Sequence, residues 1–166
     1  MAVEKEFFAV IIEDVRARHA AVGDLIKNID QQAISLLSFY PSIAIAAVSG
    51  AAAIIISVPS VPPLVGYGLA AAALCFVAGS MSCFMVLRTA IINLPGQDAA
   101  FWRWATHPKL TELQVVQAYL EAIASREAMN NAVCARGSRW LAIARMFGVL
   151  APVAAAVTML AAYRPG

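Results

Sequence analysis

Charged residues are scarce in this sequence, and their scarcity argues against an ordinary water-soluble domain. Only 13% of the residues are charged and 61% are hydrophobic, whereas a typical soluble domain has about 25% charged residues. Water would not solvate so apolar a surface, and we therefore expect a lipid bilayer as the second solvent. Lys and Arg number 12 against 10 Asp and Glu. This balance, with no basic run, argues against binding to nucleic acid.

The residues that usually carry catalysis or bind metals are also few. The chain has three cysteines and two histidines, and none of them forms a close pair or a metal-type cluster in the sequence. Phosphate-loop, nucleophile-elbow and HExxH patterns are absent. We therefore expect no enzyme, no catalytic residue, no metal and no cofactor. His19 lies among apolar residues at helical spacing, where a histidine usually packs or bonds to a partner.

A stretch without charge runs from Gln31 to Leu87 and is long enough for two membrane spans. A span needs about 20 apolar residues to cross a hydrocarbon core about 30 Å thick. We predict a transmembrane hairpin at 33–87, with a tight proline-rich turn at 59–63 between its two spans, because prolines there cannot continue a helix. Pro41 either kinks the first span or marks the start of the membrane segment.

A third span is predicted at 140–163, within a final segment, 140–166, that ends in a short outer tail. Arg145 is the only charge of this span. An arginine near the end of a span usually extends to the membrane interface, and a role facing a pore or a bound anion is the alternative. The predicted fold class is thus all-α: a membrane helical bundle of three spans with long cytoplasmic helical extensions.

The distribution of Lys and Arg predicts the orientation of these spans. Four of them precede the first span, six lie between the second and third, and the hairpin turn has none. The positive-inside rule then places the N-terminus and the 88–139 segment in the cytoplasm. The hairpin turn and the C-terminus are expected outside.

Both cytoplasmic segments, 1–32 and 88–139, have apolar residues at spacings of three and four, typical of amphipathic helices. No strong stop separates the first segment from its span, so one helix from about Val3 into the membrane is a candidate. Thr111 to Gln114 fits a capping box that begins the later helix. We expect the two stripes to pack on each other or on other copies. They are Phe8, Ile12, Val15, His19, Val22, Ile26 and Ile29 in the first segment, and Leu113, Val116, Leu120 and Ile123, with Ala124 as a further candidate, in the second.

Small residues in the spans favour close helix packing. Gly68 and Ala72 are four residues apart, as are Gly79 and Cys83, and such spacing lets helix backbones approach closely. The contacts would lie within one chain or between chains. Span serines either bond back to their own backbone or line a water route. Three spans can hardly enclose such a route, so a pore would need a homo-oligomer.

The linker between the second span and the later helix is the one irregular cytoplasmic stretch that we expect. Its aromatic residues cluster around Arg103 and have three interpretations. They would form an interfacial belt, or a ligand or partner platform on which a planar base stacks while arginine meets a phosphate, or they would simply pack. Gly137 and Ser138 are a candidate hinge. The ligand-binding candidates are Trp102, Arg103, Trp104, Arg126, Arg136 and Arg139.

Two short motifs carry a resemblance to a known family. The entry to the first span reads Ile29 to Leu37, with Asp30 and Ala33, and the later helix runs from Tyr119 to Arg136. This order of helices and motifs resembles the transmembrane effectors of the Pycsar anti-phage system. Gln32 and Arg136 stand where that family usually has lysine.

The resemblance implies a dormant multi-pass protein of the bacterial inner membrane. A cyclic pyrimidine mononucleotide, cCMP or cUMP from a partner cyclase, would activate it to disrupt the membrane and cause abortive infection. No recognisable cyclic-nucleotide-binding domain is present, so the site would form on the cytoplasmic helices or between protomers. The alternative is a non-enzymatic accessory or scaffold subunit of a larger membrane complex, with a stalk stripe as its docking face.

Overall fold

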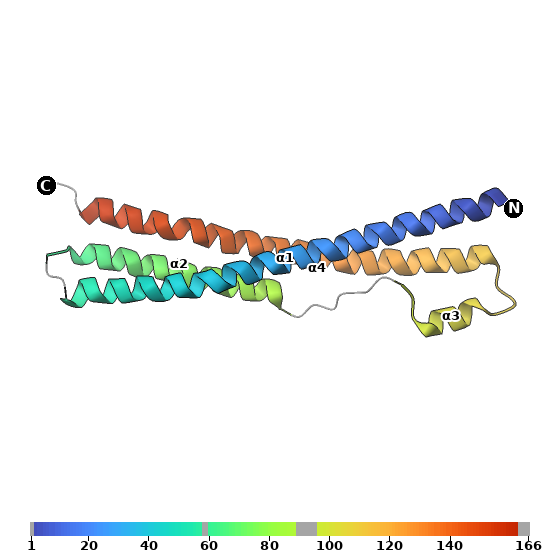
Figure 1. The fold of residues 1–166 in the computed structure, drawn as a ribbon, viewed down its shortest axis with the longest axis horizontal. Coiled ribbons are helices and arrows are strands. Elements are labelled where there is room, and N and C mark those ends of the chain that lie inside the picture. The colour runs from blue at the N-terminus through green and yellow to red at the C-terminus, as the bar shows by residue number, and fades with distance from the viewer. Residues whose placement is uncertain (1, 58–59, 89–95, 163–166) are drawn as a thin grey trace. The chain divides into compact units, whose positions relative to one another are not determined.

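The computed structural model describes residues 2–57, 60–88 and 96–162, with side chains from residue 8 onward. Within these residues four helices and no strand are present: α1 (Ala2–Ser57), α2 (Pro63–Leu87), α3 (Ala99–Ala105) and α4 (Glu112–Ala162) (Figure 1). Helices α1, α2 and α4 each contain a stretch long and apolar enough to cross a membrane. The predicted all-α class with three apolar spans is confirmed.

Helix α1 continues without interruption from the first amphipathic stripe into the first apolar stretch, as the sequence suggested. Pro41 lies inside it with helical residues on both sides. Proline has no backbone N–H and cannot make the usual bond to the preceding turn. The chain therefore accommodates Pro41 within one helix.

The predicted proline-rich turn ends one residue earlier than expected. Residues 58 and 59 lie outside the described residues, and α2 already begins at Pro63. Proline suits the first position of a helix, because its fixed φ matches the helix and its missing N–H would have no helical partner there. The Val65 amide donates to the Pro62 carbonyl at 3.0 Å. Pro63 is thus part of the helix and not of the turn.

The linker is not wholly irregular, which corrects the prediction. Residues Ala99–Ala105 form the short helix α3. The Asp98 side chain accepts a hydrogen bond from the Phe101 amide at 2.8 Å and caps the helix, as aspartate commonly does. The aromatic residues of the linker therefore project from a helix.

Helix α4 begins at the predicted capping box. The Thr111 amide donates to Oε1 of Gln114 at 2.9 Å, and the Gln114 amide donates to Oγ1 of Thr111 at 3.3 Å. The helix then runs unbroken through Gly137 and Ser138 to Ala162. The candidate hinge is helical in this structure, and residue 163 of the predicted third span lies outside the described residues.

The chain divides into two compact units. Unit 1 comprises Met1–Asn28 and Thr89–Ala135, and unit 2 comprises Ile29–Arg88 and Arg136–Gly166. Unit 1 contains the start of α1, all of α3 and the start of α4. Unit 2 contains α2 and the apolar parts of α1 and α4. Unit 1 falls within the segments 1–32 and 88–139, for which a cytoplasmic location stays a prediction.

Tyr40 of α1 contacts both of the other helices of unit 2. Its hydroxyl donates to the Ala144 carbonyl of α4 at 3.1 Å, and its ring lies 5.4 Å from the ring of Phe76. A Cβ added to Gly79 would lie 2.7 Å from Cε2 of Tyr40, and one added to Gly148 would overlap the Tyr40 hydroxyl. Glycines of α2 and α4 thus make room for this ring from two directions.

The small residues of α2 pack within one chain. Gly68, Ala72, Gly79 and Cys83 are all buried, and a Cβ at Gly68 would overlap the side chain of Thr158. Serines of the spans bond to carbonyls of the preceding turn, including Ser35 to Gln31 at 2.9 Å and Ser82 to Ala78 at 2.9 Å. Within this single chain, the small residues of α2 are thus packed against its own helices, and these serines bond to their own backbone.

Candidate functional site

The foundation of the candidate site is the packing of α1 against α4 in unit 1. The predicted stripe of α1 is its inward face, since His19 and Ile26 are buried there. The polar contacts that join the helices include a hydrogen bond from Nε of Arg16 to the Tyr119 hydroxyl at 2.9 Å and an ion pair of Arg18 with Glu127 at 2.7 Å. The two cytoplasmic stripes were expected to pack on each other or on other copies, and the first arrangement is observed.

The inward face of α4 agrees with the predicted stripe at Val116 and Ile123 and differs from it at Leu113 and Ala124. Leu113 is 51% exposed and Ala124 is also exposed, so these two assignments are wrong. The buried residues follow spacings of three, four and seven, like the seam of a coiled coil, and Leu113 and Ala124 fall beside that seam. The buried seam residues are Val116, Tyr119, Ile123 and Asn130.

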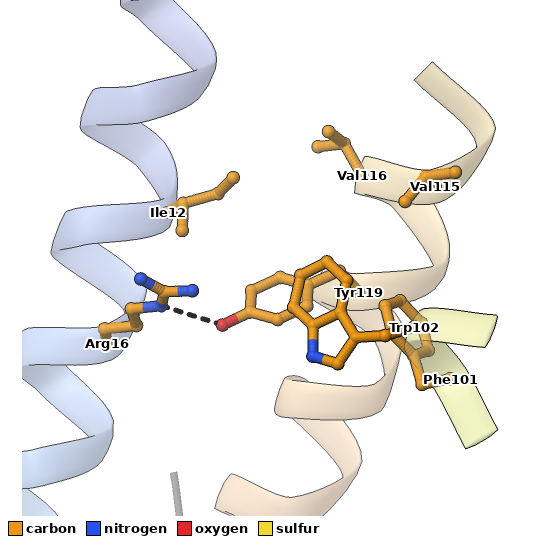
Figure 2. A pocket seen from close by; sticks show the side chains of 7 residues that line it. All are labelled: Ile12, Arg16, Phe101, Trp102, Val115, Val116 and Tyr119. Atoms are coloured by element: carbon orange, nitrogen blue, oxygen red, sulfur yellow. Dashed lines mark hydrogen bonds between the residues drawn. The ribbon is translucent and has the colours of Figure 1, made fainter. Parts of the chain in front are cut away.

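A cavity of about 160 Å³ opens at the end of this seam where α3 approaches it (Figure 2). Its walls come from all three helices of unit 1, and aromatic and aliphatic side chains form most of them. Figure 2 shows Arg16 of α1 extending toward Tyr119 of α4, with the aromatic residues of α3 beside that ring. The lining residues are Ile12, Arg16, Phe101, Trp102, Val115, Val116 and Tyr119.

The aromatic rings of the cavity form one connected cluster. The Phe101 ring lies 5.4 Å from Trp102 and 6.1 Å from Tyr119, and Trp102 lies 6.3 Å from Tyr119. Aromatic pairs are attractive at centroid separations of about 4.5 to 7 Å. The rings therefore support one another, while Trp102 keeps 48% of its surface exposed.

Arg16 supplies the positive charge of the cavity. Its guanidinium carbon lies 5.7 Å from the centroid of the Tyr119 ring, within the range of about 6 Å for a cation–π contact. The bond from Nε to the Tyr119 hydroxyl orients the group. This bond uses one of the five N–H donors of a guanidinium. The cavity therefore combines an oriented cation with flat apolar walls.

Arg126, one of the predicted ligand residues, contacts the segment that precedes α3. Its guanidinium donates to the carbonyl of Gly96 and to Oε1 of Gln97, the latter at 2.9 Å. Gly96 has φ +105°, a conformation that favours glycine. Arg126 thus fastens the chain just before α3 to the side of α4, and we interpret it as a positioning residue for the α3 aromatics.

The predicted ligand residues do not gather in one place. Trp102 lines the cavity, and Trp104 packs against Phe101 with centroids 5.5 Å apart. Arg103 is exposed on α3. Arg136 and Arg139 are exposed on α4. They belong to unit 2, as do the candidate hinge residues Gly137 and Ser138, whereas the aromatic cavity belongs to unit 1.

Arg16 was not among the site residues predicted from the sequence. It entered only as one of the positive charges that predict orientation. Tyr119, its bonding partner, entered only as part of a motif. A signal was nevertheless present, because Arg16 lies one turn beyond Ile12 of the stripe and therefore borders the packed face.

In the part of the chain that the structure describes, no group of three or more His, Cys, Asp or Glu side chains is placed to hold a metal ion. Comparisons with family models, curated proteins and solved structures found no match to the chain. The fold therefore defines a broad class only. It is an all-α protein with three helices long and apolar enough to cross a membrane, carrying an aromatic cavity edged by arginine.

Proposed function

We propose that this protein is a membrane effector activated by a cyclic pyrimidine mononucleotide, cCMP or cUMP, which binds in the cavity of unit 1. The observation that carries the proposal is the combination of flat aromatic walls with the Arg16 guanidinium in one cavity. Such a pair of surfaces matches the two chemically distinct ends of a nucleotide. The resemblance of the span-entry and later-helix motifs to Pycsar effectors supports the same function.

The aromatic walls suit a nucleobase. Stacking of a base on an aromatic side chain is worth about 1 to 3 kcal/mol, and Phe101, Trp102 and Tyr119 line the cavity. Its volume of about 160 Å³ is below the range of about 300 to 1,000 Å³ for pockets that enclose a whole ligand. We infer that a single six-membered ring enters while the sugar and phosphate remain at the mouth. This favours a pyrimidine over the larger purine.

The Arg16 guanidinium suits the phosphate. Phosphate and guanidinium form charge-assisted hydrogen bonds that are roughly twice as strong as neutral ones. The four N–H groups not used in the bond to Tyr119 suffice for a bidentate contact. Arg103, which is exposed on α3, is a second candidate for the phosphate.

Activation would then act through helices that both units share. Helices α1 and α4 each supply residues to the cavity and continue into unit 2. A ligand that draws Arg16, α3 and Tyr119 together would change how α1 and α4 pack, and in several assembled copies this would disrupt the integrity of the inner membrane. Abortive infection is the proposed biological outcome.

The decisive experiment measures binding to the purified full-length protein in detergent. Equilibrium dialysis with cCMP, cUMP and cAMP should show saturable binding of at least one pyrimidine nucleotide and weaker binding of cAMP. Arg16→Gln should reduce the affinity at least tenfold, because a charge-assisted bond is worth about 1.5 to 3 kcal/mol. Arg18→Gln is the matched control, since Arg18 is two residues away and pairs with Glu127 outside the cavity.

A membrane-potential dye in cells reports the downstream effect. Depolarisation should require both the nucleotide and Arg16. The proposal fails if neither pyrimidine nucleotide binds, or if Arg18→Gln reduces affinity as much as Arg16→Gln. Dye loss that ignores the nucleotide would likewise count against it.

The alternative, an accessory or scaffold subunit, needs a different docking face from the one predicted. The stripes of α1 and α4 pack against each other in unit 1 and are not available. Trp102, Trp104 and Leu113 remain substantially exposed and would supply the docking face instead. A transporter or secretion operon around the gene would favour this subunit, and a nucleotide cyclase would favour the effector.

A further inference from the structure

Arg145 is the arginine that lies deepest in an apolar stretch of this chain. It sits on α4 five residues after Trp140, between Ala144 and Met146, in the predicted third span. Its guanidinium donates to Oε1 of Gln32 on α1, also in unit 2. A charged group at such a depth is costly unless it reaches the interface or finds a partner.

The register of the helices shows which way the Arg145 side chain extends. In unit 2, Tyr40 contacts Ala144, which is 104 residues further along the chain, and Ile29 lies beside Gly137. Residues at the same level are thus 104 to 108 positions apart, whereas Arg145 and Gln32 are 113 positions apart. The excess of five to nine residues places the Cα of Arg145 roughly 8 to 13 Å beyond the level of Gln32, at about 1.5 Å per residue. The arginine therefore reaches back along α4 toward Trp140, as helical side chains tend to do.

The partner of Arg145 is neutral, so the guanidinium charge is not compensated by this bond. The segments of unit 2 contain five arginines and one acidic residue, Asp30. The ion pairs found among the described residues, Arg18 with Glu127 and Lys27 with Asp24, both belong to unit 1. The chain itself thus supplies little negative charge to this end of the spans.

The side chains around Arg145 indicate where a compensating anion would come from. Met146 is 60% exposed and Val149 is 66% exposed on the same side of α4. An apolar exposed face of a predicted span is covered by acyl chains in a bilayer. An anion beside Arg145 would therefore sit where lipid headgroups meet these chains.

We propose that Arg145, oriented by Gln32, binds the phosphate of an anionic phospholipid at the Trp140 end of the third span. The Gln32 bond uses one guanidinium N–H group and leaves a fork for the phosphate oxygens. The acyl chains of the same lipid would lie along Met146 and Val149. This site is independent of the nucleotide cavity, which belongs to unit 1.

Native mass spectrometry of the full-length protein in detergent tests the proposal with phosphatidylglycerol and phosphatidylcholine of identical acyl chains. The wild type should bind phosphatidylglycerol more tightly. Arg145→Gln should reduce this affinity about fivefold, the usual effect of one basic residue at an anionic surface, while binding to phosphatidylcholine stays unchanged. Arg145→Lys should give an intermediate loss, because it keeps the charge and loses the fork.

Arg88→Gln is the matched control, because Arg88 is an exposed arginine at the end of the second span in the same unit. It should change the affinity for phosphatidylglycerol less than twofold. An equal loss in this control would show attraction by overall charge and overturn the site. Unchanged lipid binding by a folded Arg145→Gln protein would overturn it as well.

Inorganic phosphate in excess distinguishes the lipid from a soluble anion. It should leave the bound phosphatidylglycerol in place, because the acyl chains hold the lipid at the protein. Displacement of the lipid by phosphate would assign the site to a free anion and refute the lipid proposal. Thermal unfolding of each variant, followed in the same detergent, separates a lost site from a lost fold.

Discussion

Tyr40 offers the sharpest test of how the apolar helices pack. Gly79 of α2 and Gly148 of α4 both lie against its side chain, and its hydroxyl bonds to the Ala144 carbonyl. We predict that Gly79→Ala and Gly148→Ala each destabilise the protein. The reason is that the ring is confined from two sides and held at its hydroxyl, so it cannot rotate away from an added methyl group.

The magnitude follows from the distances. A Cβ at Gly79 would lie 2.7 and 2.9 Å from two ring carbons of Tyr40, whereas carbon atoms pack best at about 3.5 to 4.0 Å. Overpacking of this kind costs about 1 to 3 kcal/mol. Replacing glycine by alanine in a helix returns about 0.5 to 1 kcal/mol, which leaves a net loss of up to roughly 2.5 kcal/mol. The corresponding drop in Tm is up to about 10 °C for a chain of this size.

The assay is thermal unfolding of the detergent-solubilised protein, followed by circular dichroism. Gly23→Ala is the control, since an added Cβ at that helical position meets nothing within 4 Å and should leave Tm unchanged or raise it. The sign of the change in Tm therefore distinguishes a glycine that is confined by Tyr40 from a helical glycine with open space around it. If Gly79→Ala and Gly148→Ala raised Tm as the control does, the proposed confinement of Tyr40 would be refuted.

A double-mutant cycle isolates the contact with Tyr40. In a Tyr40→Ala background, the alanine at Gly79 should no longer destabilise, because the ring that it meets is gone. Residues in direct contact usually couple by about 0.5 to 3 kcal/mol. Additive effects of the two substitutions would show that Gly79 and Tyr40 do not share this contact.

Three further predictions concern unit 1. Thr111→Ala should lower the unfolding free energy by about 1 kcal/mol, because it removes the N-terminal cap of α4 that pairs with Gln114; an unchanged Tm would contradict that role. Arg126→Gln should speed limited proteolysis near α3, because the preceding loop loses its anchor, and an unaltered cleavage rate would argue against the anchor. Arg18→Gln should lower the unfolding free energy by about 1 kcal/mol or less, because the Arg18 side chain is 71% exposed, although that of Glu127 is only 14% exposed; a larger loss measured by unfolding would show that the Glu127 carboxylate depends on this pair.

The helices themselves were largely predictable from the sequence. The capping box at Thr111 fixed the start of α4, and the absence of a stop signal before the first span predicted the continuous α1. The helix α3 was missed, because seven residues are too few to show a helical period, and its clearest signal is the single capping residue Asp98. Local signals of this kind are readable when they repeat over several turns and weak when they do not.

The candidate site was only partly predictable. The sequence drew attention to Trp102 because aromatic residues cluster around it, and this residue does line the cavity. It also grouped Arg126, Arg136 and Arg139 as anion-binding candidates by charge alone. The structure uses Arg126 to hold the loop and leaves the other two exposed in unit 2, while Arg16 borders the aromatic rings.

The sequence by itself determined the helical class and the apolar spans, because hydropathy and periodicity are properties of neighbouring residues. Scarcity of charge, the starting observation, indicated the membrane in the same way. Only the tertiary structure decided that Tyr40 fits between Gly79 and Gly148, that Arg145 reaches Gln32 and that Arg16 meets Tyr119. These contacts join residues of different helices, most of them more than a hundred positions apart in the sequence. Which residues meet depends on the register and rotation of the helices, and no local pattern encodes these.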